Sequence, residues 1–254
     1  MKDFTLRAYK QYLRAIRSSF QNILRFDEFF LSDPKPESFC LIRHDVDRKP
    51  QRALQIANIE NDLQIKTTYF FRTKPSIFKP DIIAKISRLG HEIGYHYESL
   101  SDTNGNLELA FKDFEKNLTN LRRFAPVRTI SMHGRPFNPF DNRAMWREAE
   151  NRALLSTKYA ILGEIYLDID YDNIAYISDT GRNWSSTKAN IRDKVNSSVS
   201  IDFKTGDALY DYLNSVPHPR MIFQIHPERW SDAFFAYYIQ YLKDHLVNII
   251  KYLR

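Results

Sequence analysis

Short apolar segments alternate with helical patterns through the first half of the 254-residue chain, and this alternation constrains the fold more than any other feature. The segments expected as strands are 39–42, 66–71, 91–98 and 127–132. Apolar residues at three- and four-residue spacing mark a helix between each pair of strands, and the connections are short. Strands and helices that alternate in this way are typical of a parallel sheet or barrel. The sequence therefore predicts an α/β fold.

The two ends and the second half of the chain add fewer constraints. An amphipathic helix is expected near the N-terminus, and another after a clean apolar strand at 221–225. Segments 164–169 and 173–177 are expected to be adjacent strands joined by a turn. Because there is no internal repeat and no convincing linker, we expect a single domain over 1–254, in which 1–38 form the extra N-terminal helix and a lead-in.

Composition narrows the possible partners and the expected location. The 37 basic and 31 acidic residues give a net charge of +6, but they are dispersed, so no nucleic-acid partner is expected. Cys40 is the only cysteine, which rules out an intramolecular disulfide. The N-terminal segment is charged throughout, unlike a signal peptide, and no run of 18 apolar residues predicts a transmembrane helix. These features predict a cytoplasmic protein.

Two carboxylates follow the first predicted strand. Asp45 and Asp47 are two residues apart, so in an extended segment they lie on the same side. Two carboxylates at such a short distance repel each other unless a cation or a shared proton compensates their charge. One interpretation is a metal-ligand Asp beside a general-base Asp. The other is a strand end whose acids pair with nearby basic residues, namely Arg43, Arg48 and Lys49.

Three histidines end or follow other predicted strands. His96, His133 and His226 occupy these positions, and the carboxyl ends of barrel strands lie on one side of the fold. They are therefore expected to meet the two carboxylates around one pocket. His91 is excluded, because it lies five residues before His96 and should face the other side of its strand.

The segment from Gly90 to His96 reads Gly-His-Glu-Ile-Gly-Tyr-His and carries a family resemblance. It matches the second motif of the polysaccharide deacetylase family, also called the NodB-homology or carbohydrate esterase 4 group, and the chain resembles a divergent branch of it. Asp45 with Asp47 resembles the first motif, and His226 the last. The third and fourth motifs are matched more loosely by Arg135-Pro136 and by Asp179 with Trp184.

The resemblance implies a distorted (β/α) barrel of about seven strands and a hydrolase that removes an acetyl group from an N-acetylated sugar. The implied cofactor is one divalent metal, expected to be zinc, and the expected substrate is a cytoplasmic precursor in surface-polysaccharide synthesis. The implied roles are the following: Asp45 is the general base, His226 is the acid, Asp47 and His96 bind the metal, Asp179 orients His226, Arg135 pairs with Asp45, and Trp184 stacks on a sugar.

One departure from the family pattern leaves alternatives open. Leu100 stands where the family has another metal-binding histidine, so a third ligand must come from elsewhere. His133, at the end of the neighbouring strand, is the expected replacement, and Glu98 is a weaker candidate. If neither binds metal, the chain could be a metal-independent hydrolase of a cyclic amide. A non-catalytic module that binds glycan or nucleic acid is the remaining alternative.

Overall fold

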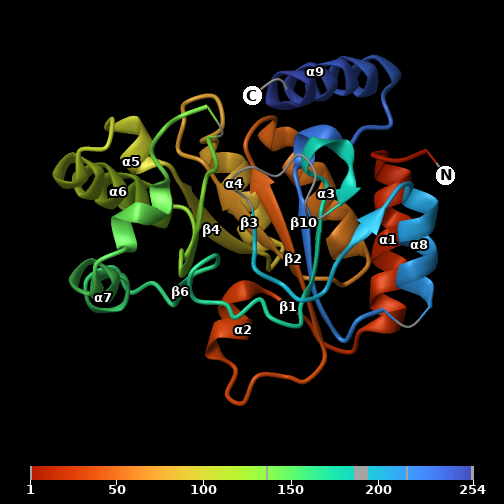
Figure 1. Ribbon diagram of the computed structural model, residues 1–254, viewed down its shortest axis with the longest axis horizontal. Coiled ribbons are helices and arrows are strands. Elements are labelled where there is room, and N and C mark those ends of the chain that lie inside the picture. The colour runs from red at the N-terminus through yellow and green to blue at the C-terminus, as the bar shows by residue number, and fades with distance from the viewer. Residues whose placement is uncertain (1, 136, 186–193, 216, 253–254) are drawn as a thin grey trace.

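The computed structural model describes residues 2–135, 137–185, 194–215 and 217–252. Its main sheet is entirely parallel, and seven strands follow one another in the order β6-β5-β4-β3-β2-β10-β7. The sheet curls into a half-barrel with helices packed around it (Figure 1). The predicted fold class, a distorted (β/α) barrel of about seven strands with an added N-terminal helix, is confirmed.

The strands of this sheet vary in length: three have six to eight residues and the others have two to four. They are β1 (Ile23–Leu24), β2 (Phe39–Val46), β3 (Thr68–Phe71), β4 (Glu92–Tyr97), β5 (Thr129–Met132), β6 (Gly163–Glu164), β7 (Ala175–Ser178) and β10 (Arg220–Ile225). A separate antiparallel pair consists of β8 (Trp184–Ser185) and β9 (Asp202–Phe203).

The α-helices mostly cover the outside of the sheet. They are α1 (Leu6–Ser19), α2 (Phe26–Leu31), α3 (Pro50–Asp62), α4 (Pro80–Arg88), α5 (Ser99–Asp102), α6 (Leu107–Arg122), α7 (Ala149–Thr157), α8 (Gly206–Asn214) and α9 (Phe234–Tyr252). Short 3-10 turns form η1 (Asn142–Trp146), η2 (Thr180–Arg182) and η3 (Pro227–Arg229). No helix in the described ranges is both long and apolar enough to cross a bilayer.

Strand β2 is the centre of the sheet, and each of its residues is buried. It pairs with β10 along six residues and with β3 at its carboxyl end, while β1 pairs with its first half. Because all these strands are parallel, their carboxyl ends lie along one edge of the sheet. The polar residues that follow β2, β4, β5, β7 and β10 are thereby brought together.

The expected hairpin of segments 164–169 and 173–177 is wrong. Strand β6 ends at Glu164 and pairs with β5, whereas β7 pairs with β10 at the other end of the sheet. The residues between them cross from one end of the sheet to the other. Their apolar side chains Ile165, Ile169 and Tyr171 are buried in a small core with Phe26 and Leu41, which explains the strand-like pattern.

Candidate metal and acid–base site

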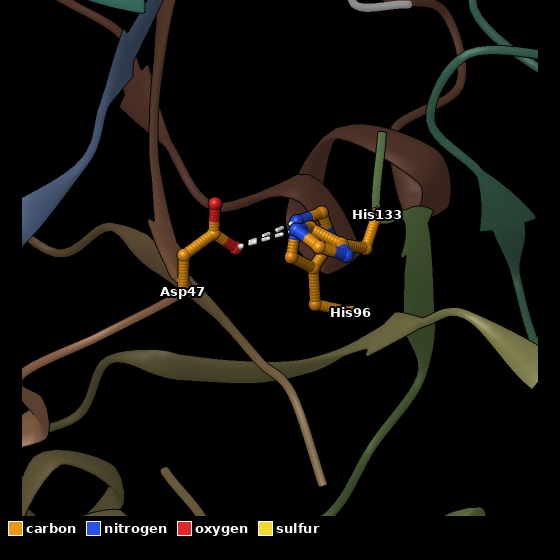
Figure 2. Close-up of side chains that lie close together, drawn as sticks. All are labelled: Asp47, His96 and His133. Atoms are coloured by element: carbon orange, nitrogen blue, oxygen red, sulfur yellow. Dashed lines mark ion pairs between the residues drawn. The ribbon is translucent and has the colours of Figure 1, made fainter. Parts of the chain in front are cut away.

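Three side chains from neighbouring strands meet at the carboxyl edge of the sheet. Asp47 follows β2, His96 lies in β4, and His133 follows β5. Oδ1 of Asp47 lies 3.4 Å from Nε2 of His96 and 3.5 Å from Nε2 of His133. Figure 2 shows both rings directed at this one oxygen. The structure thus brings together the three residues expected to bind metal.

Both rings are held in the tautomer that a metal ligand requires. Nδ1 of His96 donates to the carbonyl oxygen of Ser131 at 2.9 Å, and Nδ1 of His133 donates to Oε2 of Glu98 at 3.0 Å. A neutral imidazole that donates from Nδ1 has an unprotonated Nε2, so in its neutral form each ring offers the Nε2 lone pair to the space beside Asp47. Glu98 therefore positions His133 and does not itself belong to the ligand set.

The spacing of these atoms fits a divalent cation. Two ligands of a tetrahedral zinc ion, each at about 2.0–2.1 Å, are about 3.3 Å apart. The observed separations from Asp47 Oδ1 are close to this value, and the three ligand atoms all lie within 4.8 Å of one another. Within the described residues, buried Oδ1 of Asp47 has no hydrogen-bond partner. A buried carboxylate oxygen without a donor is costly, and a cation at this point would satisfy it.

The charges at this point also favour a cation. Burial raises the pKa of Asp47, but His133 and His96 together lower it well below its usual value. Burial lowers the pKa of His133, but Asp47 and Glu98 raise it to about 9. In the absence of an ion, a proton on His133 thus balances the adjacent carboxylates.

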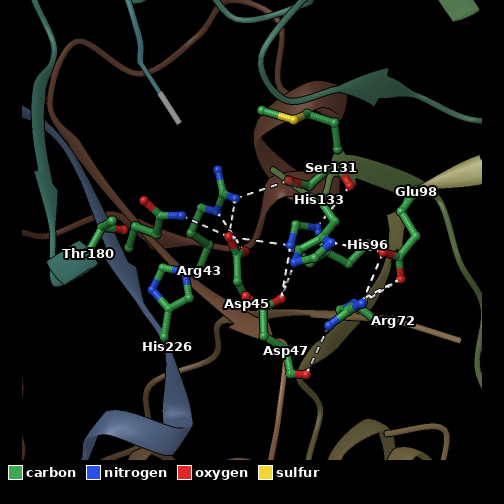
Figure 3. Close-up of polar contacts among 12 residues, drawn as sticks. Arg43, Asp45, Asp47, Arg72, His96, Glu98, Ser131, His133, Thr180 and His226 are labelled. Atoms are coloured by element: carbon green, nitrogen blue, oxygen red, sulfur yellow. Dashed lines mark hydrogen bonds and ion pairs between the residues drawn. The ribbon is translucent and has the colours of Figure 1, made fainter. Parts of the chain in front are cut away.

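Asp45 is held beside the triad by a buried arginine, and the expected partner Arg135 is wrong. Arg43 donates from Nε and Nη2 to the two Asp45 oxygens at 3.0 and 2.6 Å, and Gln224 donates to Oδ2 at 2.7 Å (Figure 3). Burial raises the Asp45 pKa, but the Arg43 charge outweighs it and lowers the value to about 2. Arg135 lies farther out, where it pairs with Asp102 at 3.0 Å.

His226 and Asp179 form a second buried pair, as expected from the sequence. Nδ1 of His226 donates to Oδ1 of Asp179 at 2.6 Å, and Arg229 and Trp230 both donate to the same carboxylate. Burial and Arg229 lower the His226 pKa, but Asp179 and Asp45 raise it above the usual value overall. His226 lies near Asp45 on the side away from His133 (Figure 3).

Trp184 lies in the core, so its expected contact with a sugar is wrong. The ring is buried and stacks on Phe4 at 5.1 Å and on Phe223 at 6.0 Å. Leu100 is likewise a buried core residue, and the space beside Asp47 is filled by His133 instead. Pro136, which belongs with Arg135 to the loosely matched third motif, lies outside the described residues.

Several polar residues that hold the site were not identified from the sequence. Gln224 lies within the apolar strand β10, where its amide oxygen accepts from Tyr176 and Ser178 and its nitrogen reaches Asp45. A polar residue inside the apolar segment 221–225 is a signal that could have identified it. Arg72 follows β3 and donates to both oxygens of Glu98. It therefore holds the carboxylate that orients His133.

No family model and no curated protein matches the chain. Among solved structures it is similar to a Streptococcus mutans CE4 esterase, with 15% identity, a TM-score of 0.46 and 86% of each chain covered. It is also similar to the Xyl-CE4 domain of a multidomain xylanase from the hindgut metagenome of Trinervitermes trinervoides, with 14% identity and a TM-score of 0.37. That match covers 75% of this chain and 88% of the other.

Proposed function

We propose that this chain is a metal-dependent hydrolase that removes the acetyl group from an N-acetylated sugar. The observation that carries the proposal is the convergence of Asp47, His96 and His133, in which both rings are held through Nδ1 and direct Nε2 at a buried carboxylate oxygen. Metal sites that hydrolyse amides and esters combine such ligands with a base and an acid. Here the base, Asp45, is paired with Arg43, and the acid, His226, is paired with Asp179; both pairs lie beside the triad.

The two pairs determine which residue acts as the base and which as the acid. A divalent ion held by the triad would polarise an acyl carbonyl and lower the pKa of water. Asp45 is ionised at neutral pH, because Arg43 keeps its pKa near 2, and it therefore accepts the proton of the attacking water. His226 is favoured in its protonated form by Asp179 and donates its proton to the departing sugar amine. Acetate and the free amine are the products.

The identity of the metal and the substrate completes the proposal. Two imidazoles and one carboxylate are a ligand set of catalytic zinc, so we propose zinc. We further propose a cytoplasmic sugar precursor as the substrate. The free, buried Cys40 supports a reducing compartment, because the chain needs no disulfide for its folding. The motif resemblance supports an N-acetylated sugar.

The test measures acetate release and bound metal on the same samples. Wild-type protein loaded with zinc is incubated with a panel of N-acetylated monosaccharides and oligosaccharides. Asp45→Asn should keep the ion and lose about 10²–10⁴-fold in rate, as expected when a general base is removed. The control is Asp168→Asn, which removes a carboxylate that pairs with Arg152 beyond β6. Full activity in Asp45→Asn, or no acetate from any zinc-loaded sample, would contradict the proposal.

A further inference from the structure

The C-terminal helix α9 turns its polar side toward the protein. Gln240 and Asp244 are buried against the domain, and Asp244 accepts from Arg182 at 2.9 Å and from Gln240 at 3.0 Å. Asn248 donates to the carbonyl oxygen of Gly181 at 2.8 Å. A helix that packs on its own domain normally buries its apolar side. In α9 the usual arrangement is reversed.

The apolar side of α9 faces outward. Nine of its apolar and aromatic side chains are between 38% and 80% exposed, and we call them the α9 stripe: Phe234, Phe235, Tyr238, Ile239, Tyr241, Leu242, Leu246, Ile249 and Ile250. The stripe extends over about 25 Å at the helical rise of about 1.5 Å per residue. Figure 1 shows α9 at the top of the molecule, with no other part of the described chain on its outer side. A contiguous apolar surface of this kind marks an interaction site.

Basic residues border the α9 stripe. Nζ of Lys2 lies 4.0 Å from the ring centre of Tyr237 and 4.7 Å from that of Tyr238, at the start of the helix. Lys243 is exposed, and within the described residues neither it nor Lys49 has an ion pair. Burial, together with repulsion from Arg52 and Lys243, lowers the pKa of Lys49, while Glu228 and Asp244 attract it. The exposed Lys243 and the Lys2 ammonium beside Tyr238 favour an anionic surface.

Three acidic residues lie near the helix, and one of them, Glu228 in η3, is buried and attracts Lys49. Asp244 points inward, where it is paired with Arg182. Asp232 accepts from the backbone N–H of Arg7 and also attracts Arg52. No acidic residue belongs to the exposed side of α9 in the part of the helix whose side chains are described.

We propose that the α9 stripe docks onto the surface of a bilayer that contains anionic lipids. Interfacial helices combine a face of Phe, Leu and other apolar residues with neighbouring Lys and Arg, and they lie parallel to the membrane plane. The aromatic rings at the start of α9 suit the headgroup region, where amphipathic rings accumulate. The bordering lysines are placed to meet anionic headgroups.

A second copy of the chain fits this surface less well. Lys243 lies at the middle of α9, which covers Phe234–Tyr252. In a twofold antiparallel pairing that buries the whole length of the stripe, the axis passes beside the middle of the helix, so the middle residues of both copies lie near each other. Two Lys243 ammonium groups would then approach each other, and like charges across an interface are unfavourable. An anionic membrane surface, in contrast, attracts the Lys243 ammonium group.

The position of α9 links this surface to the candidate site. The helix packs on η2 and η3, which follow β7 and β10 at the carboxyl edge of the sheet. Arg229 in η3 donates to Asp179, the partner of His226. Docking by α9 would hold this edge of the sheet near the membrane. This placement points to a substrate class, an N-acetylated sugar carried at the membrane surface. That step rests on the proposed function.

The test is flotation of the full chain with lipid vesicles, and it requires no activity. Wild-type protein should float with vesicles of phosphatidylcholine mixed with phosphatidylglycerol, and less with phosphatidylcholine alone or at high salt. The double variant Leu242→Glu, Leu246→Glu should lose roughly tenfold or more in partitioning. Leu31→Glu is the matched control, because Leu31 is similarly exposed on α2. Lys243→Gln should weaken binding, whereas Lys116→Gln on α6 should not.

Light scattering on the same proteins separates the alternatives. The proposal expects a monomer in solution and vesicle binding that depends on both the stripe and the lysines. It is overturned if wild-type protein floats no better than the double variant. It is also overturned if wild-type protein is a dimer that the double variant dissociates, because the stripe would then be a self-association interface. Circular dichroism of each variant checks that it is folded. Failure of acetate release with intact vesicle binding would reject only the proposed function.

Discussion

Glu98 offers a sensitive test of how the chain holds His133. The carboxylate is almost fully buried, accepts from Nδ1 of His133 at 3.0 Å, and is itself held by two donors from Arg72 at 2.9 Å. Burial raises its pKa, but His133 and Arg72 lower it to about 2, so at neutral pH it acts only as an acceptor. Glu98→Gln keeps the shape of the side chain and replaces the charged acceptor with a neutral one.

The expected loss follows from the position of Glu98 behind a ligand. Carboxylates that orient a metal-binding histidine contribute about 10–100-fold to affinity, or about 1.4–2.7 kcal/mol. We therefore expect the zinc dissociation constant of Glu98→Gln to rise by that factor. The assay is a competition titration of metal-free protein against a chromogenic zinc chelator.

The control is chosen to match the Glu–His contact. Glu60→Gln changes a buried glutamate that lies 2.7 Å from Nε2 of His44, on the other side of β2 from the triad. Its zinc affinity should stay within about twofold of wild type, since it touches no ligand. The reasoning is refuted if Glu98→Gln binds zinc as tightly as wild type, or if Glu60→Gln weakens binding as much.

Three further predictions concern stability, each measured by urea unfolding. Arg43→Met leaves the buried Asp45 charge without its partner and should lower the unfolding free energy by about 3–5 kcal/mol; an unchanged value would contradict the pairing. Burial raises the pKa of Glu92 from 4.5 to about 7, so between these pH values the folded chain binds a proton that the unfolded chain has released. The free energy of unfolding therefore falls as the pH rises from about 4.5 to about 7. Glu92→Gln should remove this slope and raise stability at about pH 8 by up to about 3 kcal/mol. A Cβ at Gly94 would overlap the Phe70 ring, so Gly94→Ala should cost about 1–3 kcal/mol, and adding Phe70→Leu should recover part of it.

The edge of the sheet that carries the site could be predicted from local patterns. Each strand in the first half is an apolar segment that ends in polar residues, and parallel pairing brings those ends together whatever the details of packing. For this reason His96 and His133 reach Asp47, as expected, although they are 37 residues apart. The opposite orientation of His91 also follows from the two-residue period of a strand, and its ring contacts Thr67 and Ala57 on the far side.

The wrong predictions concern strand pairing and side-chain burial that depend on distant parts of the chain. Strands β6 and β7 end opposite edges of the sheet, and β7 pairs with β10, which comes much later in the sequence, so no local pattern shows this arrangement. Trp184 follows a polar loop and resembles a sugar-binding aromatic in sequence, but Phe4 from the other end of the chain covers its ring. Burial of that kind is set by tertiary packing.

The partner of Asp45 could have been found from the sequence. Arg43 precedes Asp45 by two residues in one strand, so the two side chains lie on the same side by the same rule that pairs Asp45 with Asp47. The family resemblance instead directed attention to Arg135, which pairs with Asp102.

The central claim is that Asp47, His96 and His133 bind one divalent ion together, and anomalous diffraction from crystals grown with zinc tests it directly. The account predicts one strong peak per chain, about 2.0–2.2 Å from Oδ1 of Asp47 and from Nε2 of both histidines. The peak should be lost in His133→Ala crystals. A zinc ion bound elsewhere, or bound at this point without His133, would contradict the account.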